Sequence, residues 1–223
     1  MSDQSDYATK VWLKSYEQGV KSSVAFKDIL VSQYLEKSAQ NFPENPALIF
    51  QGFTLSFKEL NEMVARFAAA LKGFGVKKGD SIAILLPNVI PCVVAYYATL
   101  KVGGIVVLNN PLYSDRELEH QFTDSDSTFL ITLDLLANRM VKLRKKTKIK
   151  TIVYTSIGDY LPFIKHLLFP LVAKRKGLAA DVSPAKDLYK FKDVIAKYSP
   201  DYTQTNVNIN DVAMYQYTGG TTG

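Results

Sequence analysis

The sequence predicts an α/β fold in which a mostly parallel sheet is flanked by helices. Short apolar, β-branched runs alternate along the chain with helical patterns, and this alternation is typical of right-handed βαβ units. One run, SIAILL at 81–86, is apolar almost throughout, as expected of a strand that is covered on both faces. No internal repeat or low-complexity tract is visible, so one continuous α/β domain is expected.

The predicted helices are marked by apolar residues at a spacing of three or four and by start and stop signals. Ser23 is the candidate cap of a first helix that runs through Gln40. A second helix starts at the capping box SFKE, residues 56–59, and ends at two glycines, Gly73 and Gly75. Further helices are expected at 91–102, 114–124, 135–146 and 187–198.

The predicted strands are short apolar runs bounded by turn residues. Residues 47–50 and 53–55 read as a hairpin, with Gln51 and Gly52 as its turn. The other strands are expected at 81–86, 105–108, 128–132, 151–154 and 212–216. The last strand leads directly into the glycine-rich end of the sequence, which is therefore expected at the carboxyl edge of the sheet, where α/β proteins bind ligands.

Composition excludes several classes of protein. Of the 223 residues 47% are hydrophobic and 22% are charged, which fits neither a disordered chain nor a membrane bundle. The single cysteine, Cys92, rules out an internal disulfide or a Cys-based zinc site and fits a reducing compartment. Residues 1–23 lack an apolar signal segment, and no run approaches the ~20 apolar residues of a spanning helix. A cytoplasmic protein is expected.

The net charge of +6 is concentrated in one region. Residues 142–176 hold ten Lys and Arg residues but one acid, Asp159. These bases flank a short apolar stretch at 161–173, a combination that suits docking on the anionic inner face of a cell membrane. The alternative is a solvated helix followed by a surface excursion. Nucleic-acid binding is not expected, because no recognised module is present.

The final loop carries the chemistry that the sequence predicts. Its glycines let successive N–H groups point into one concavity, the threonines add hydroxyl donors, and phosphate is the natural occupant. A Walker A loop is excluded, because the glycine spacing is one residue short and no lysine follows. A merely flexible loop is the alternative. The candidate phosphate contacts are Thr218, Gly219, Gly220, Thr221, Thr222 and Gly223.

Several motifs in order resemble one family of enzymes. QYTGGTTG at 216–223 resembles the phosphate-binding signature of adenylate-forming enzymes. The segments TLSFKEL, GVKKGDSIAILLPN, KVGGIVVLNNPLY and SDRELEHQFTDS resemble the start of bacterial long-chain fatty acid–CoA ligases. The resemblance runs from about Val24 to Gly223, so residues 1–23 are expected to be an N-terminal extension and residues 24–223 part of an N-terminal AMP-binding domain.

The resemblance implies a reaction and its partners. The loop would hold the phosphates of ATP, shielded by Mg²⁺, while a fatty carboxylate attacks the α-phosphorus; the thiol of coenzyme A then displaces AMP. No catalytic residue and no metal ligand is expected within these residues. The family's signature continues to a lysine, whereas this sequence stops at Gly223. We therefore expect a fragment that is inactive by itself and is cut within its phosphate loop.

Two other functions stay open from the sequence. One is a ligase of the same superfamily for shorter or aromatic acids, because no residue here indicates the chain length of the substrate acid. The other is a noncatalytic module that docks on membranes or forms a homodimer. Among single residues, His120 is expected on a solvated helix face, Cys92 in packing, and Asp124 and Asp126 in a solvated turn. Tyr217 is expected either beside the nucleotide or packed at the strand end.

Overall fold

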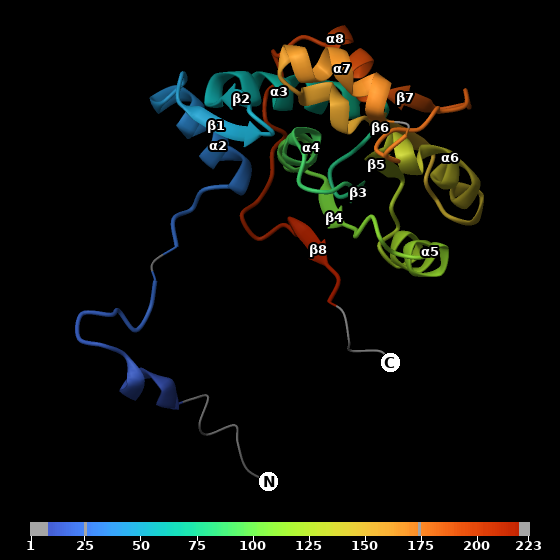
Figure 1. The fold of residues 1–223 in the computed structure, drawn as a ribbon. Helices are drawn as coiled ribbons and strands as arrows, with labels where there is room; N and C mark the ends of the chain where they lie inside the picture. Colours follow the sequence, from blue (N-terminus) through green and yellow to red (C-terminus); the bar gives the residue numbers. More distant parts are fainter. Residues whose placement is uncertain (1–8, 25, 174, 219–223) are drawn as a thin grey trace.

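The computed structural model describes residues 9–24, 26–173 and 175–218, and it confirms the α/β class. Its centre is a six-stranded sheet in the order β7-β6-β5-β3-β4-β8, in which every pairing is parallel. Figure 1 shows this sheet between layers of helices. The strands are β3 (Ser81–Leu85), β4 (Ile105–Leu108), β5 (Phe129–Leu133), β6 (Thr151–Thr155), β7 (Leu188–Lys190) and β8 (Met214–Gln216).

The predicted hairpin forms a separate two-stranded sheet. Strands β1 (Pro46–Phe50) and β2 (Phe53–Ser56) pair antiparallel. Their turn uses two left-handed residues, Gln51 at φ 53° and Gly52 at φ 92°, which are the backbone angles that tight hairpin turns require. The hairpin lies beside the helix that follows it, α3 (Phe57–Gly73), so it extends the helical layer and adds no strand to the central sheet.

The helices cover the two faces of the sheet separately. One face carries α3, α4 (Ile90–Lys101) and α8 (Phe191–Lys197), with α2 (Val31–Asn41) packed on α3 and α4. The other face carries α5 (Asp115–Asp124) and α6 (Asp134–Leu143). Residues along β3 divide between the two faces because side chains of a strand alternate. Ile82 and Ile84 join the first cluster, whereas Ala83 and Leu85 join the second.

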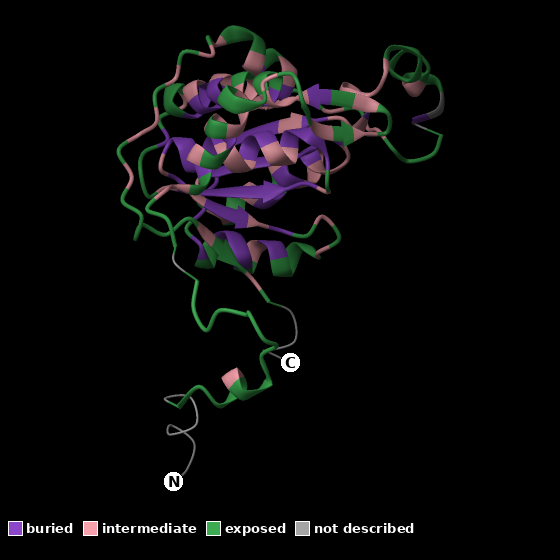
Figure 2. Ribbon diagram, turned by 90° about the vertical axis from the view of Figure 1, so that its left-hand side faces the viewer, coloured by how far each residue is buried: buried purple, intermediate pink, exposed green. Residues whose placement is uncertain are grey.

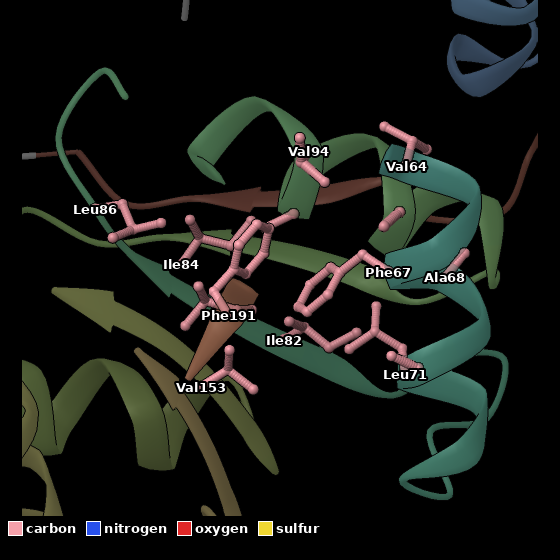
Figure 3. Packing of buried hydrophobic residues seen from close by; sticks show 14 of the residues in the cluster. Val64, Phe67, Ala68, Leu71, Ile82, Ile84, Leu86, Val94, Val153 and Phe191 are labelled. Atoms are coloured by element: carbon pink, nitrogen blue, oxygen red, sulfur yellow. The ribbon is translucent and has the colours of Figure 1, made fainter. Parts of the chain in front are cut away.

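The larger core cluster lies under α3 and α8. The rings of Phe67 and Phe191 pack with their centroids 4.8 Å apart, and both side chains are fully buried. Figure 3 shows these rings beside Ile82 and Ile84 of β3, and Figure 2 shows the central strands as the most buried part of the molecule. The buried positions of β3 confirm the prediction of a strand covered on both faces.

Helix starts follow local signals where a capping box is present. At α3, Ser56 Oγ accepts a hydrogen bond from Glu59 N at 3.2 Å, and Glu59 Oε2 accepts one from Ser56 N at 2.8 Å. This reciprocal pair satisfies N–H groups that the helix itself cannot. The capping box predicted at 114–117 forms in the same way and starts α5.

The structure corrects the predicted ends of two helices. The first helix begins at Val31, not after Ser23, and Phe26, which was expected on its apolar stripe, is 91% exposed. The expected helix at 187–198 is instead a strand, β7, followed by α8 from Phe191. Pairing with β6 holds residues 188–190 extended. The apolar stretch after residue 161 contains a helix of its own, α7 (Phe163–Ala173).

The remaining short elements are single 3₁₀ turns. They are η1 (Val11–Ser15), η2 (Arg144–Lys146) and η3 (Ile157–Tyr160). In the described ranges, no helix combines the length and the apolar character that crossing a membrane requires.

Candidate functional site

The predicted phosphate loop begins at the carboxyl edge of the sheet. β8 pairs with β4 in the register Leu108↔Gln216, and Thr218 follows two residues after that pair as an exposed residue. The chain order and the parallel pairing therefore bring the loop to the edge where β3 and β4 also end. The other five candidate contacts, Gly219, Gly220, Thr221, Thr222 and Gly223, lie outside the described residues.

A hollow of about 460 Å³ opens between the ends of these three strands. Its walls come from the loop after β3, the loop after β4 and the end of β8. The lining residues include Asn88, Asn109, Asn110, Gln121, Gln216 and Tyr217. Amide side chains and backbone groups thus form much of the wall, which suits a polar ligand. Thr218 directly follows a lining residue.

Asn109 lines this hollow and also carries a buried, unpaired acceptor. Its side chain is 5% exposed, and its Nδ2 donates to Gln121 Oε1 at 2.7 Å. Its Oδ1 is buried and has no hydrogen-bond partner among the described residues. A buried acceptor without a partner costs free energy, so a ligand or water that donates to Asn109 Oδ1 would be favoured here.

Tyr217 fixes the end of β8 to the helix beneath it. Its hydroxyl donates to Asp124 Oδ2 at 2.6 Å and lies 3.3 Å from the carbonyl oxygen of Gln121. Burial, followed by the hydrogen bond to Asp124, raises the pKa of Tyr217 to about 12. The structure thus supports packing of Tyr217 at the strand end. Asp124 is exposed as predicted, but its contact with a residue 93 positions away was not predicted.

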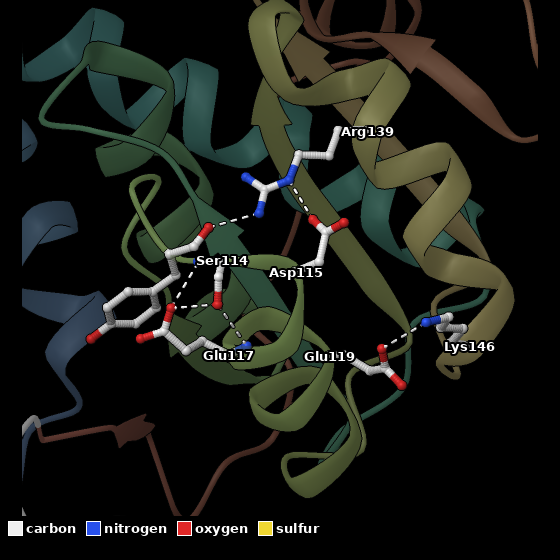
Figure 4. A network of polar contacts seen from close by, with 7 residues as sticks. Ser114, Asp115, Glu117, Glu119, Arg139 and Lys146 are labelled. Atoms are coloured by element: carbon white, nitrogen blue, oxygen red, sulfur yellow. Dashed lines mark hydrogen bonds and ion pairs between the residues drawn. The ribbon is translucent and has the colours of Figure 1, made fainter. Parts of the chain in front are cut away.

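Helix α5 is in turn held by polar contacts at its N-terminal end and near its middle, which Figure 4 shows. Arg139 of α6 donates from Nε to Asp115 Oδ1 at 2.5 Å and from Nη2 to the carbonyl oxygen of Tyr113 at 2.7 Å. Lys146 Nζ lies 3.4 Å from Glu119 Oε2. Hydrogen bonding by Ser114 lowers the pKa of the Glu117 carboxyl. These contacts position the helix to which Tyr217 is attached.

The other candidate residues lie apart from this edge. His120 is exposed on α5, as predicted. Cys92 is half-buried against the larger core cluster, and burial raises the pKa of its thiol, so it packs as a neutral apolar group. Across the residues that the structure describes, no group of three or more His, Cys, Asp or Glu side chains is arranged to hold a metal ion.

The fold and this edge define a class: an α/β protein in which a parallel strand is followed in sequence by a glycine- and threonine-rich segment. The model of the family described as AMP-binding enzyme matches residues 35–223. The chain therefore belongs to the AMP-binding enzyme family, which confirms the resemblance seen in its motifs.

Named relatives agree with this membership. A long-chain-fatty-acid–CoA ligase of Bacillus subtilis is 35% identical over 224 residues, covering 96% of this chain and 38% of that protein. The ligase of the same name from Escherichia coli O157:H7 is 33% identical, with 96% and 39% covered. The chain thus spans less than two fifths of the length of these relatives.

Solved structures show the same fold. An anthranilate CoA ligase in complex with anthranoyl-AMP superposes with a TM-score of 0.73 at 20% identity, covering 92% of this chain and 35% of that one. A long-chain-fatty-acid-CoA ligase from Archaeoglobus fulgidus gives 0.69 at 23% identity, covering 92% and 37%. Both matches are to adenylate-forming ligases.

Proposed function

We propose that this chain is part of an ATP-dependent long-chain fatty acid–CoA ligase and contributes the start of its nucleotide-phosphate site. The observation that carries the proposal is the position of Thr218, next to a polar hollow at the carboxyl ends of β3, β4 and β8. Family membership and the names of the most similar relatives support it.

In the proposed reaction, the fatty carboxylate attacks the α-phosphorus of ATP, and the bond to pyrophosphate breaks. The thiol of coenzyme A then forms the thioester and releases AMP. Bound Mg²⁺ supplies charge neutralisation on the phosphates. Such chemistry depends on positioning more than on a protein nucleophile.

The residues of this chain would bind and orient the phosphates. Thr218 is exposed, and its hydroxyl would donate to a phosphate oxygen, while the N–H groups of residues 219–223 would complete the nest. The hydrogen bond from Tyr217 to Asp124 fixes the direction in which the loop leaves β8.

The direct test is binding of ATP with Mg²⁺ to the purified 223-residue chain, measured by calorimetry. Thr218→Ala should weaken ATP binding severalfold, whereas Thr218→Ser keeps the hydroxyl and should retain it. Thr203→Ala, at another exposed threonine, should leave ATP binding unchanged. No acyl-CoA is expected from this chain alone, given its share of the relatives' length. Thioester formation by it, or equal ATP binding by all variants, would contradict the proposal.

Substrate length separates the main proposal from a ligase for shorter or aromatic acids. The full-length protein should form acyl-CoA fastest with acids of long chain in a graded series. A maximum at acetate, benzoate or anthranilate would assign the second function. Because long-chain acids partition into bilayers, we also propose that the protein works at the inner face of the cell membrane as a peripheral protein.

A further inference from the structure

Helix α7 exposes one continuous apolar face. Its five residues Phe163, Ile164, Leu167, Leu168 and Leu171 are between 51% and 82% exposed. Their spacing of i, i+1, i+4, i+5 and i+8 places them on one side of the helix. Exposed large apolar side chains are ordinary when they are scattered, but a contiguous patch marks an interaction surface.

The opposite side of α7 is anchored to the body of the protein. Phe169 packs closely on Gly158 of η3, where an added Cβ would lie 2.3 Å from Phe169 Cδ1. His166 Nδ1 lies 2.7 Å from the carbonyl oxygen of Gly158, and Lys165 Nζ donates to the carbonyl oxygen of Gln51 at 2.7 Å. Ala173 is fully buried. These contacts turn the apolar face outward, and Figures 1 and 2 show α7 at the outside of the molecule.

Charge around α7 selects the kind of partner. Residues 160–180 contain no acid and four bases. Lys165 is engaged with Gln51, and the other three, Lys174, Arg175 and Lys176, directly follow the helix in sequence. A short apolar helix face with basic residues at its end matches a helix that lies in the interface of an anionic bilayer. An apolar protein partner would not require this excess of positive charge.

The earlier part of the basic region is engaged in contacts within the protein. Lys148 Nζ pairs with Asp126 Oδ1 at 2.6 Å, and Lys146 pairs with Glu119. Arg144 donates to the carbonyl oxygens of Lys150 and Lys186. Three of the six bases at 142–150 are thus engaged within the protein, so the inference rests on α7 and the bases that follow it.

We infer that the apolar face of α7 docks the protein on an anionic lipid surface, with the helix lying in the plane of the interface. Eleven residues reach about 16 Å, which is too short to span a bilayer. The inference rests on the proposed function in one respect, since a ligase docked in this way would meet fatty acids in the bilayer where they partition.

Vesicle co-sedimentation of the purified protein, without ATP or coenzyme A, tests the inference. Vesicles with 30% phosphatidylglycerol should bind at least tenfold more protein than pure phosphatidylcholine vesicles, and added salt should weaken the binding. Leu167→Gln combined with Leu171→Gln should lower binding at least tenfold without changing net charge. Leu112→Gln is the control, because Leu112 is also an exposed leucine, at 90%, but lies in the loop between β4 and α5.

A second measurement separates insertion from electrostatic adsorption. An environment-sensitive dye attached at Leu168→Cys, in a Cys92→Ser background, should shift to the blue when anionic vesicles are added. Absent binding, equal binding to both vesicle types, or unchanged binding by the double variant would overturn the inference. If the unchanged protein forms a dimer and binds no vesicles, and the variant with Leu167→Gln and Leu171→Gln is monomeric, the face would be assigned to a second copy of the chain instead. Because the assay uses no nucleotide, its failure leaves the ATP-binding test unaffected.

Discussion

The Tyr217 hydroxyl links the last described strand to the C-terminal end of α5 through its hydrogen bond to Asp124. We predict that Tyr217→Phe lowers the free energy of unfolding by about 1 kcal/mol at pH 7, the usual net value of such a bond. The exposed Tyr215 lies on the same strand, and Tyr215→Phe should have little effect. Urea unfolding at equilibrium measures both changes.

The burial of Tyr217, followed by its hydrogen bond to Asp124, predicts an alkaline pH dependence. The pKa of Tyr217 is raised to about 12 in the folded protein, above the value of about 10 in an unfolded chain. A group with a raised pKa contributes stability that is fully present below the unfolded pKa and is lost as the pH rises through the folded value. Between pH 10 and about 12 the protein should therefore lose a stability contribution that Tyr217→Phe does not have, so the stability difference between the two should change across that range. A constant difference across that range would contradict the assignment.

Gly104 shows a constraint of space at the start of β4. A Cβ added there would lie 2.8 Å from Ile82 Cδ1 and 3.1 Å from the carbonyl oxygen of Asp80. We predict that Gly104→Ala destabilises the fold by about 2 kcal/mol through overpacking. Ile82→Val removes the nearest atom, so the double variant should lose clearly less than the sum of the two single changes. Simple additivity in urea unfolding would argue against this contact as the cause.

At the scale of elements, a charged pair joins α2 to α4. Lys101 is 6% exposed, and its Nζ pairs with the partly buried Glu36. We predict that Lys101→Met costs about 2 kcal/mol, because the partly buried carboxylate of Glu36 then loses its charged partner. Combining it with Glu36→Leu should recover most of the loss. A double-mutant cycle measures the coupling, and a double variant as unstable as the sum would refute it.

The sequence predicted the elements whose signals are local. The apolar run of β3 and the reciprocal cap of Ser56 and Glu59 each lie within a few residues, and both form as predicted. Strand β7 was missed because its three half-buried residues are extended only through pairing with β6. Two prolines, Pro162 and Pro170, obscured the helical pattern of α7.

The candidate site was predictable to a similar degree. Its position after the last strand followed from residue order, because parallel strands end at a common edge. The contacts that shape it join distant segments and left no local trace. Asn109 meets Gln121 across a loop and a helix, and Tyr217 meets Asp124 across 93 positions. Side-chain pairing of this kind depends on the packed fold, which residue patterns do not specify.

At the scale of the whole molecule, the two core clusters lie on opposite faces of one sheet and share its strands. Ile82 and Ala83 are neighbours in β3 but belong to different clusters. Loss of packing on either face therefore removes support from strands that the other face needs. We expect both clusters to unfold together in one cooperative transition, with a stability in the usual range of about 5–15 kcal/mol.

Helix α7 lies outside that unit, and hydrogen exchange should show it. Amides in β3 and β5, whose residues are all buried, are predicted to exchange only through global unfolding, with rates that rise steeply with urea. Amides of α7 should exchange through local openings that cost much less free energy than global unfolding and depend little on urea, since the helix is anchored mainly through η3. The 3₁₀ turn η1 contains no buried residue and should exchange fastest. Peptide-resolved mass spectrometry separates these segments, and α7 protected as strongly as β3 would show that it belongs to the cooperative core.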